Sequence, residues 1–175
     1  MKAVIGVAMM FLGIFIAGLQ IGGCVRSNYS FEKKYLYAWE LADRSSTIEA
    51  KANYIQQFVD AISTNKDDFA EYNAIWLQTP ENKFENNVSA LVSLKDRLNE
   101  IRKMDVSSFQ YNTAIQQITA QEQGEAHGLI RHIQGCYDLE NYWYVWDWIG
   151  GVFTISAIVL CIVGGGVALD ALSGY

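Results

Sequence analysis

The sequence has 175 residues, of which 51% are hydrophobic and only 18% charged. An average soluble domain has about 25% charged residues. All but two of the charged side chains lie between Arg26 and Asp147, so both ends of the sequence are almost uncharged. This distribution argues against an ordinary soluble globule, and a net charge of −6 argues against a nucleic-acid-binding protein. Three cysteines are too few for a disulfide-rich scaffold.

Two uncharged runs are long enough to cross a membrane. Ala3–Val25 covers 23 residues, and Trp148–Leu169 covers 22. A helix rises about 1.5 Å per residue, so each run exceeds the roughly 30 Å thickness of a hydrocarbon core. We therefore expect transmembrane helices over residues 1–26 and 148–170, followed by a short C-terminal tail over residues 171–175.

The end of the first run allows a second interpretation. Ile21-Gly22-Gly23-Cys24 resembles the lipobox of bacterial lipoproteins, in which the cysteine becomes the lipidated first residue. Residues 1–23 would then be a cleaved signal. However, the apolar run is longer than the core of a signal peptide, which has about 7–15 residues. A retained membrane anchor is the favoured interpretation.

Small residues recur at four-residue spacing in both runs, a pattern that lets transmembrane helices approach closely. The candidate packing residues are Gly13, Ala17, Gly18, Gly22, Ala157, Cys161 and Gly165. Because glycine is common in membrane helices, the spacing alone leaves open whether it marks a packing face. Three consecutive glycines, Gly164–Gly166, predict a kink or a loosened turn because each glycine weakens a helix.

A cluster of aromatic residues precedes the second run. Its members are Tyr142, Trp143, Tyr144, Trp146 and Trp148. Indole and phenol rings favour the headgroup zone of a membrane, since one end is apolar and the other forms hydrogen bonds. We therefore expect an interfacial aromatic belt, with an aromatic ligand platform as the alternative.

Residues 27–147 contain a single proline and show the three- and four-residue spacing of amphipathic helices. The clearest apolar stripes begin at Ile48 and at Phe84. Short connections favour antiparallel neighbours. The predicted fold is all-α, with two transmembrane helices flanking a water-exposed antiparallel bundle of four or five helical segments.

Local signals predict where several of these helices start. Ser46 and Glu49 have the spacing of a capping box, and Thr79-Pro80 combines a capping hydroxyl with proline at the first helical position. The last helix is expected to start near Ser108. An unbroken path from this helix into the second span is one alternative.

The most polar stretch of the last predicted helix offers a candidate site formed by Glu122, Glu125, His127 and Arg131. A di-metal site in a helical bundle needs Glu-x-x-His pairs, and neither glutamate has a histidine three residues later. We therefore expect no metal ion, no cofactor and no catalytic residue. A solvated or helix-pairing polar face is the simplest interpretation, and a membrane enzyme using Glu122, Glu125 and His127 is less favoured.

These features predict a non-enzymatic integral membrane protein, a scaffold or accessory subunit that presents a helical bundle at the membrane surface. The expected partners are the lipid bilayer and other membrane-protein chains or further copies of this chain, with no nucleic acid. A small membrane-anchored sensor or ligand-binding bundle is the alternative. The layout resembles bacterial sensor ectodomains and LemA-type anchored bundles, without a shared motif.

Two sequence signals disagree about which side of the membrane holds the bundle. Arg26, Lys33 and Lys34 follow the first run, and the positive-inside rule would place them in the cytoplasm. Long loops cross membranes regardless of their charge, and the signal-like start favours export. An extracytoplasmic bundle is therefore the favoured expectation.

Overall fold

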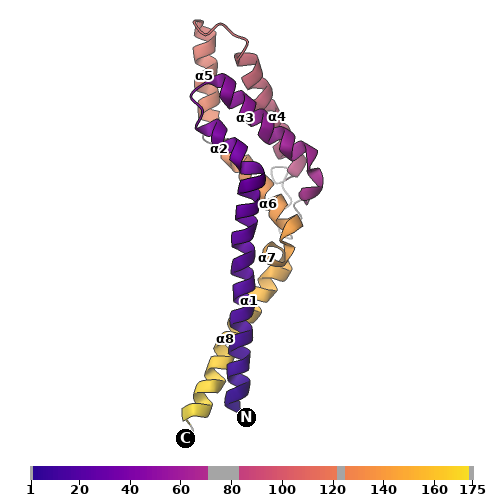
Figure 1. Cartoon of the computed structure of the whole chain (residues 1–175), viewed down its shortest axis with the longest axis vertical. Helices are drawn as coiled ribbons and strands as arrows, with labels where there is room; N and C mark the ends of the chain where they lie inside the picture. Colours follow the sequence, from indigo (N-terminus) through magenta and orange to yellow (C-terminus); the bar gives the residue numbers. More distant parts are fainter. Residues whose placement is uncertain (1, 71–82, 122–124, 174–175) are drawn as a thin grey trace. The chain divides into compact units, whose positions relative to one another are not determined.

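A computed structural model describes residues 2–70, 83–121 and 125–173 (Figure 1). These described residues form helices and contain no strand, which confirms the all-α class predicted from the sequence. The helix start expected at Thr79-Pro80 and the candidate residue Glu122 lie outside the described residues.

The chain divides into two compact units. The first unit comprises Met1–Asn28 and Tyr142–Tyr175, and the second comprises Tyr29–Asn141. The aromatic segment that starts at Tyr142 therefore groups with the apolar helices, whereas the boundary expected from the sequence lies at Trp148.

The first unit is built from α1 (Lys2–Phe31), α7 (Trp143–Trp146) and α8 (Trp148–Ser173), although the last residues of α1 belong to the second unit. Two helical stretches, Lys2–Asp43 and Ile149–Ala171, are long and apolar enough to cross a membrane. Both uncharged runs therefore have the length and the apolar character that were expected of them from the sequence.

The structure bears on two features of the second uncharged run. Helix α8 continues through Gly164–Gly166 without a break. An apolar helix keeps its internal hydrogen bonds because no water is available to replace them in lipid. The path from α6 into α8 is interrupted, since Tyr142 and Asp147 both leave the helical conformation, with Asp147 extended at φ −84° and ψ 172°.

In the part of the chain that is described, the second unit is built from helical elements. They are η1, a π-helix (Glu32–Leu36), α2 (Tyr37–Asp43), α3 (Ile48–Thr64), η2, a 3₁₀-helix (Lys66–Asp68), α4 (Phe84–Ile101), α5 (Phe109–Gln121) and α6 (His127–Asn141). Helix α3 contacts α2 and α4, and α4 in turn contacts α5 and α6 (Figure 1).

The N-cap of α3 lies one residue after the position predicted from the sequence. Thr47, not Ser46, is the N-cap, because Thr47 has the extended conformation that a cap requires. Its hydroxyl oxygen accepts a hydrogen bond from the Ala50 amide at 3.3 Å. The start expected near Ser108 is close, since α5 begins at Phe109 and the Tyr111 amide donates to the Ser108 hydroxyl at 3.1 Å.

The apolar stripes of α3 and α4 supply a large part of the core of the second unit. The buried apolar side chains on these two helices are Ala52, Ile55, Phe58, Val59, Ile62, Phe84, Leu91, Leu94, Leu98 and Ile101. From α2, Trp39 packs edge-on against Phe58, with ring centroids 5.6 Å apart. Removal of this apolar surface from water is the main stabilising force of the unit.

We predict that Phe58→Ala destabilises the second unit by about 3–5 kcal/mol, since Phe58 is 0% exposed and its removal leaves a cavity. Phe109→Ala is the matched control: Phe109 is 84% exposed, and its loss should change stability by no more than about 0.5 kcal/mol. The measurement is thermal unfolding of the full chain in detergent, followed by circular dichroism. Equal effects of the two substitutions would contradict the assigned core.

Candidate functional site

The predicted polar site is not gathered into one pocket among the described residues. Glu125 lines a small groove of about 250 Å³ together with Arg97 of α4. His127 and Arg131 are exposed on α6. Among the described residues, no group of three or more histidine, cysteine, aspartate or glutamate side chains is placed to hold a metal ion.

Close packing between α1 and α8 is the main feature of the first unit. A β-carbon built on Gly13 would lie 2.7 Å from the Cys161 Sγ and 2.8 Å from the Ala157 carbonyl oxygen. A β-carbon on Gly6 would lie 2.7 Å from the Gly164 carbonyl oxygen. Real β-carbons do not approach other atoms this closely, so only glycine fits at both positions of α1.

The other candidate packing residues lie away from this contact. A β-carbon on Gly18, Gly22 or Gly165 would meet no atom within 4 Å, and Ala17 is half-buried. The structure therefore brings together Gly13, Ala157 and Cys161, which were expected to pack, and adds Gly6 and Gly164, which were not among the candidates.

A seven-residue spacing relates four buried or half-buried positions of α1, two of which form this contact. Gly6, Gly13, Gln20 and Ser27 are each seven residues apart, and this spacing keeps one helix face against a partner helix over several turns. We call this row the α1 seam. Gly6 does not belong to the four-residue pattern of small residues, and the seven-residue spacing is the sequence signal that identifies it.

Gln20 is the strongly polar member of the α1 seam. Its side-chain amide donates a hydrogen bond to the Tyr144 carbonyl oxygen at 2.9 Å. Tyr144 lies in α7, which is followed by the extended residue Asp147, so its carbonyl lies near a helix end where partners are needed. Gln20 therefore joins α1 to the aromatic segment.

Two glycines make room for α7. A β-carbon on Gly23 of α1 would collide with the side chain of Val145, and one on Gly150 of α8 would collide with the Val145 carbonyl. The aromatic residues of this segment remain partly open, with Trp143 50% and Trp146 46% exposed. Tyr142 and Tyr144 are half-buried, and the side chain of Trp148 lies outside the part of the chain that the structure describes.

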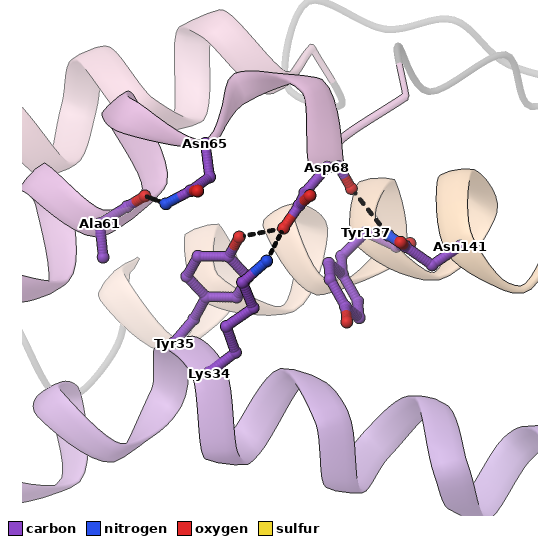
Figure 2. A network of polar contacts seen from close by, with 7 residues as sticks. All are labelled: Lys34, Tyr35, Ala61, Asn65, Asp68, Tyr137 and Asn141. Atoms are coloured by element: carbon purple, nitrogen blue, oxygen red, sulfur yellow. Dashed lines mark hydrogen bonds and ion pairs between the residues drawn. The ribbon is translucent and has the colours of Figure 1, made fainter.

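A polar network ties together three elements of the second unit (Figure 2). The Asp68 carboxylate accepts hydrogen bonds from the Lys34 ammonium and from the Tyr35 hydroxyl. The Asp68 carbonyl oxygen accepts a bond from the Asn141 side-chain amide at 2.9 Å. Asp68 thus links η1, which carries Lys34 and Tyr35, to the end of α6.

Aromatic rings surround the Tyr35 side of this network. The centroid of the Tyr35 ring lies 5.2 Å from that of Phe69 and 5.8 Å from that of Tyr137. Phe69 in turn stacks on Phe84 of α4 at 4.7 Å. The rings limit the access of water, which strengthens the hydrogen bonds inside the network.

Two opposing effects act on the pKa of Asp68. Partial burial raises it, but the hydrogen bonds from Lys34 and Tyr35 lower it by more, so the net pKa lies below the ordinary value of 3.8. No spacing in the sequence pointed to this network, because its members come from three separate elements.

The second unit also has an open groove of about 480 Å³. Its lining is Ser45–Glu49, Lys51, Arg102, Val106, Tyr111 and Ile115. These residues come from the α2–α3 connection, the start of α3, the α4–α5 connection and α5. The lining combines apolar side chains with hydroxyl groups, two cations and one carboxylate, a composition that suits a small molecule with one charged end.

No protein-family model, no curated protein and no solved structure matches this chain.

We predict that Gly13→Ala destabilises the α1–α8 pair by about 1–3 kcal/mol, because the new methyl group meets a backbone oxygen that cannot rotate away. Gly18→Ala is the control, since its methyl group meets open space and improves helix propensity by up to about 1 kcal/mol. The thermal midpoint of the full chain in detergent should fall for the first variant only. Equal midpoints would refute the close contact at Gly13.

We predict that Asp68→Asn lowers the stability of the second unit at pH 7 by about 1–2 kcal/mol, a discounted figure because water screens the half-exposed Lys34. Since the folded pKa of Asp68 lies below its ordinary 3.8, the carboxylate stabilises the fold above that pH. The contribution is lost as the pH falls through the folded pKa, so the difference between wild type and variant should shrink below about pH 4.

The control for this experiment is Asp67→Asn, because Asp67 is the exposed neighbour in the same 3₁₀-helix. Thermal unfolding is measured from pH 3 to pH 7 for all three proteins. A difference between wild type and Asp68→Asn that is independent of pH would show that the charge of Asp68 has no part in the network.

Proposed function

We propose that this chain is a non-enzymatic integral membrane protein, a scaffold or accessory subunit that crosses the bilayer twice and presents a helical bundle at its surface. The observation that carries the proposal is the arrangement of side chains on α1 and α8. Small residues face the contact between the helices, and large apolar side chains face away from it. Soluble helix pairs have the opposite arrangement, because water drives large apolar side chains into the contact.

The outward side chains form an extensive apolar surface. On α1 the exposed apolar residues are Val4, Ile5, Val7, Phe11, Leu12, Ile14, Phe15, Leu19, Ile21 and Val25. On α8 they are Val152, Phe153, Ile155, Ile158, Val159, Ile162, Val163 and Leu169. A soluble monomer rarely exposes contiguous apolar surface of this kind, whereas lipid solvates it without cost.

Lateral association with other membrane chains or with further copies is part of the proposal. The α1 seam is occupied within the chain, so such partners would contact the outward surface of the two helices. The bundle is proposed to lie on the extracytoplasmic side, with protease access in sealed vesicles as the direct test. Chemical crosslinking in native membranes followed by mass spectrometry would identify the partners.

A second candidate function is a small membrane-anchored sensor or ligand-binding bundle. The open groove of about 480 Å³ in the second unit favours it. A membrane enzyme using Glu122, Glu125 and His127 has less support, because Glu125 and His127 are both exposed. If alanine at all three positions leaves folding and metal content unchanged, the enzyme hypothesis fails.

We predict that the full chain stays in the membrane fraction after alkaline carbonate extraction and floats with the lipid in a density gradient. Two spanning helices hold a protein in the bilayer through their buried apolar surface, which neither high pH nor high salt removes. Release into the carbonate supernatant would contradict the proposal. A peripheral membrane protein expressed in the same cells is the control for complete extraction.

A further inference from the structure

We propose that the open groove between the start of α3 and α5 binds a small organic anion with an apolar portion, such as an aromatic or aliphatic carboxylate. This inference rests on the second candidate function, a ligand-binding bundle, and is independent of how the chain meets the membrane. The volume of about 480 Å³ falls within the roughly 300–1,000 Å³ of typical small-molecule sites.

Arg102 supplies the main recognition group for the anion. It follows the last residue of α4, and its amide donates to the Leu98 carbonyl at 3.0 Å, which fixes its backbone. Its guanidinium Nη1 donates to the Asn53 side-chain oxygen at 3.2 Å. This contact uses one of five N–H donors and orients the group, so a carboxylate can be bound by the planar fork.

The charges along the groove favour an anion over a cation. Lys51 of α3 lines the groove with Arg102, and Glu49 is the one acidic residue in the lining. The lining thus carries two cationic side chains and one anionic side chain. The surrounding segment has the opposite sign, since residues 27–147 carry 11 basic and 18 acidic side chains for a net charge of −7.

The apolar wall provides the contact for the rest of the ligand. Tyr111 and Ile115 are four residues apart on α5 and therefore share one helix face. Val106, from the α4–α5 connection, lines the same groove and is 68% exposed. A ligand with an apolar body would remove these side chains from water while its charged end reaches Arg102.

The experiment titrates the full chain in lipid nanodiscs with para-trifluoromethyl benzoate and follows binding by fluorine NMR. The neutral analogue, para-trifluoromethyl benzyl alcohol, should bind at least about tenfold more weakly, because it lacks the charge that the guanidinium recognises. Arg102→Gln should raise the Kd for the benzoate at least about tenfold for the same reason.

Two further variants separate binding from folding. Glu49→Gln should lower the Kd about two- to fivefold, since it removes a negative charge from the groove and leaves every other contact in place. Lys103→Gln alters the exposed neighbour of Arg102, which does not line the groove, and should leave the Kd unchanged. The thermal midpoint of each variant is measured alongside.

The proposal is overturned if the wild-type chain shows no saturable binding of the benzoate, if Arg102→Gln binds it as tightly as wild type, or if Glu49→Gln weakens binding. Carbonate extraction and flotation remain a separate readout. A chain that stays in the membrane but does not bind the benzoate would refute the groove proposal and leave the membrane proposal standing.

Discussion

The contact between α1 and α8 leaves no room for a side chain at Gly6 or Gly13, and the rest of the first unit depends on this closeness. Backbones that approach so closely gain dispersion contacts at these positions, and in the proposed bilayer setting such contacts would be the main attraction between the two helices. The same closeness turns the large side chains outward. Gln20 and Gly23 of α1 lie beside α7, where the Gln20 amide donates a hydrogen bond to the Tyr144 carbonyl oxygen and Gly23 leaves room for the Val145 side chain.

The second unit is held together by different forces. Its α3 and α4 stripes bury large apolar side chains, which is the arrangement expected for a domain in water. Asp68 adds a directional element, since it links two basic or phenolic donors of η1 to the end of α6. The two units thus have opposite side-chain patterns, with large apolar residues directed inward in the second unit and outward in the first.

Much of this architecture could be predicted from residue patterns. The two uncharged runs are evident from their length and the stripes beginning at Ile48 and Phe84 from local periodicity, and each is found as a helix. The α1 seam was missed because four-residue spacing was the expected signal, while antiparallel helices that wrap around each other repeat every seven residues. The cap at Thr47 was misplaced by one residue because three hydroxyl residues in a row could each serve.

The candidate sites were harder to anticipate, for a physical reason. The Asp68 network and the groove each combine residues from three or more elements, and no spacing along the chain reveals which elements meet. The groove shows this most clearly, since Lys51 and Arg102 are far apart in the sequence and both line it. The predicted site around Glu125 was chosen for local polarity, and polarity on a helix is also what a solvated face requires.

The most direct test of the central claim uses the native Cys161, whose Sγ lies 3.9 Å from the Met10 carbonyl oxygen. In a background with Cys24→Ser and Cys136→Ser, Met10→Cys and Phe11→Cys are each oxidised in native membranes. Phe11 is 63% exposed and lies on the outward surface of α1. The account predicts an intramolecular disulfide to Cys161 from position 10 and little or none from position 11. Equal crosslinking at both positions, or none at position 10, would contradict the packing of α1 against α8.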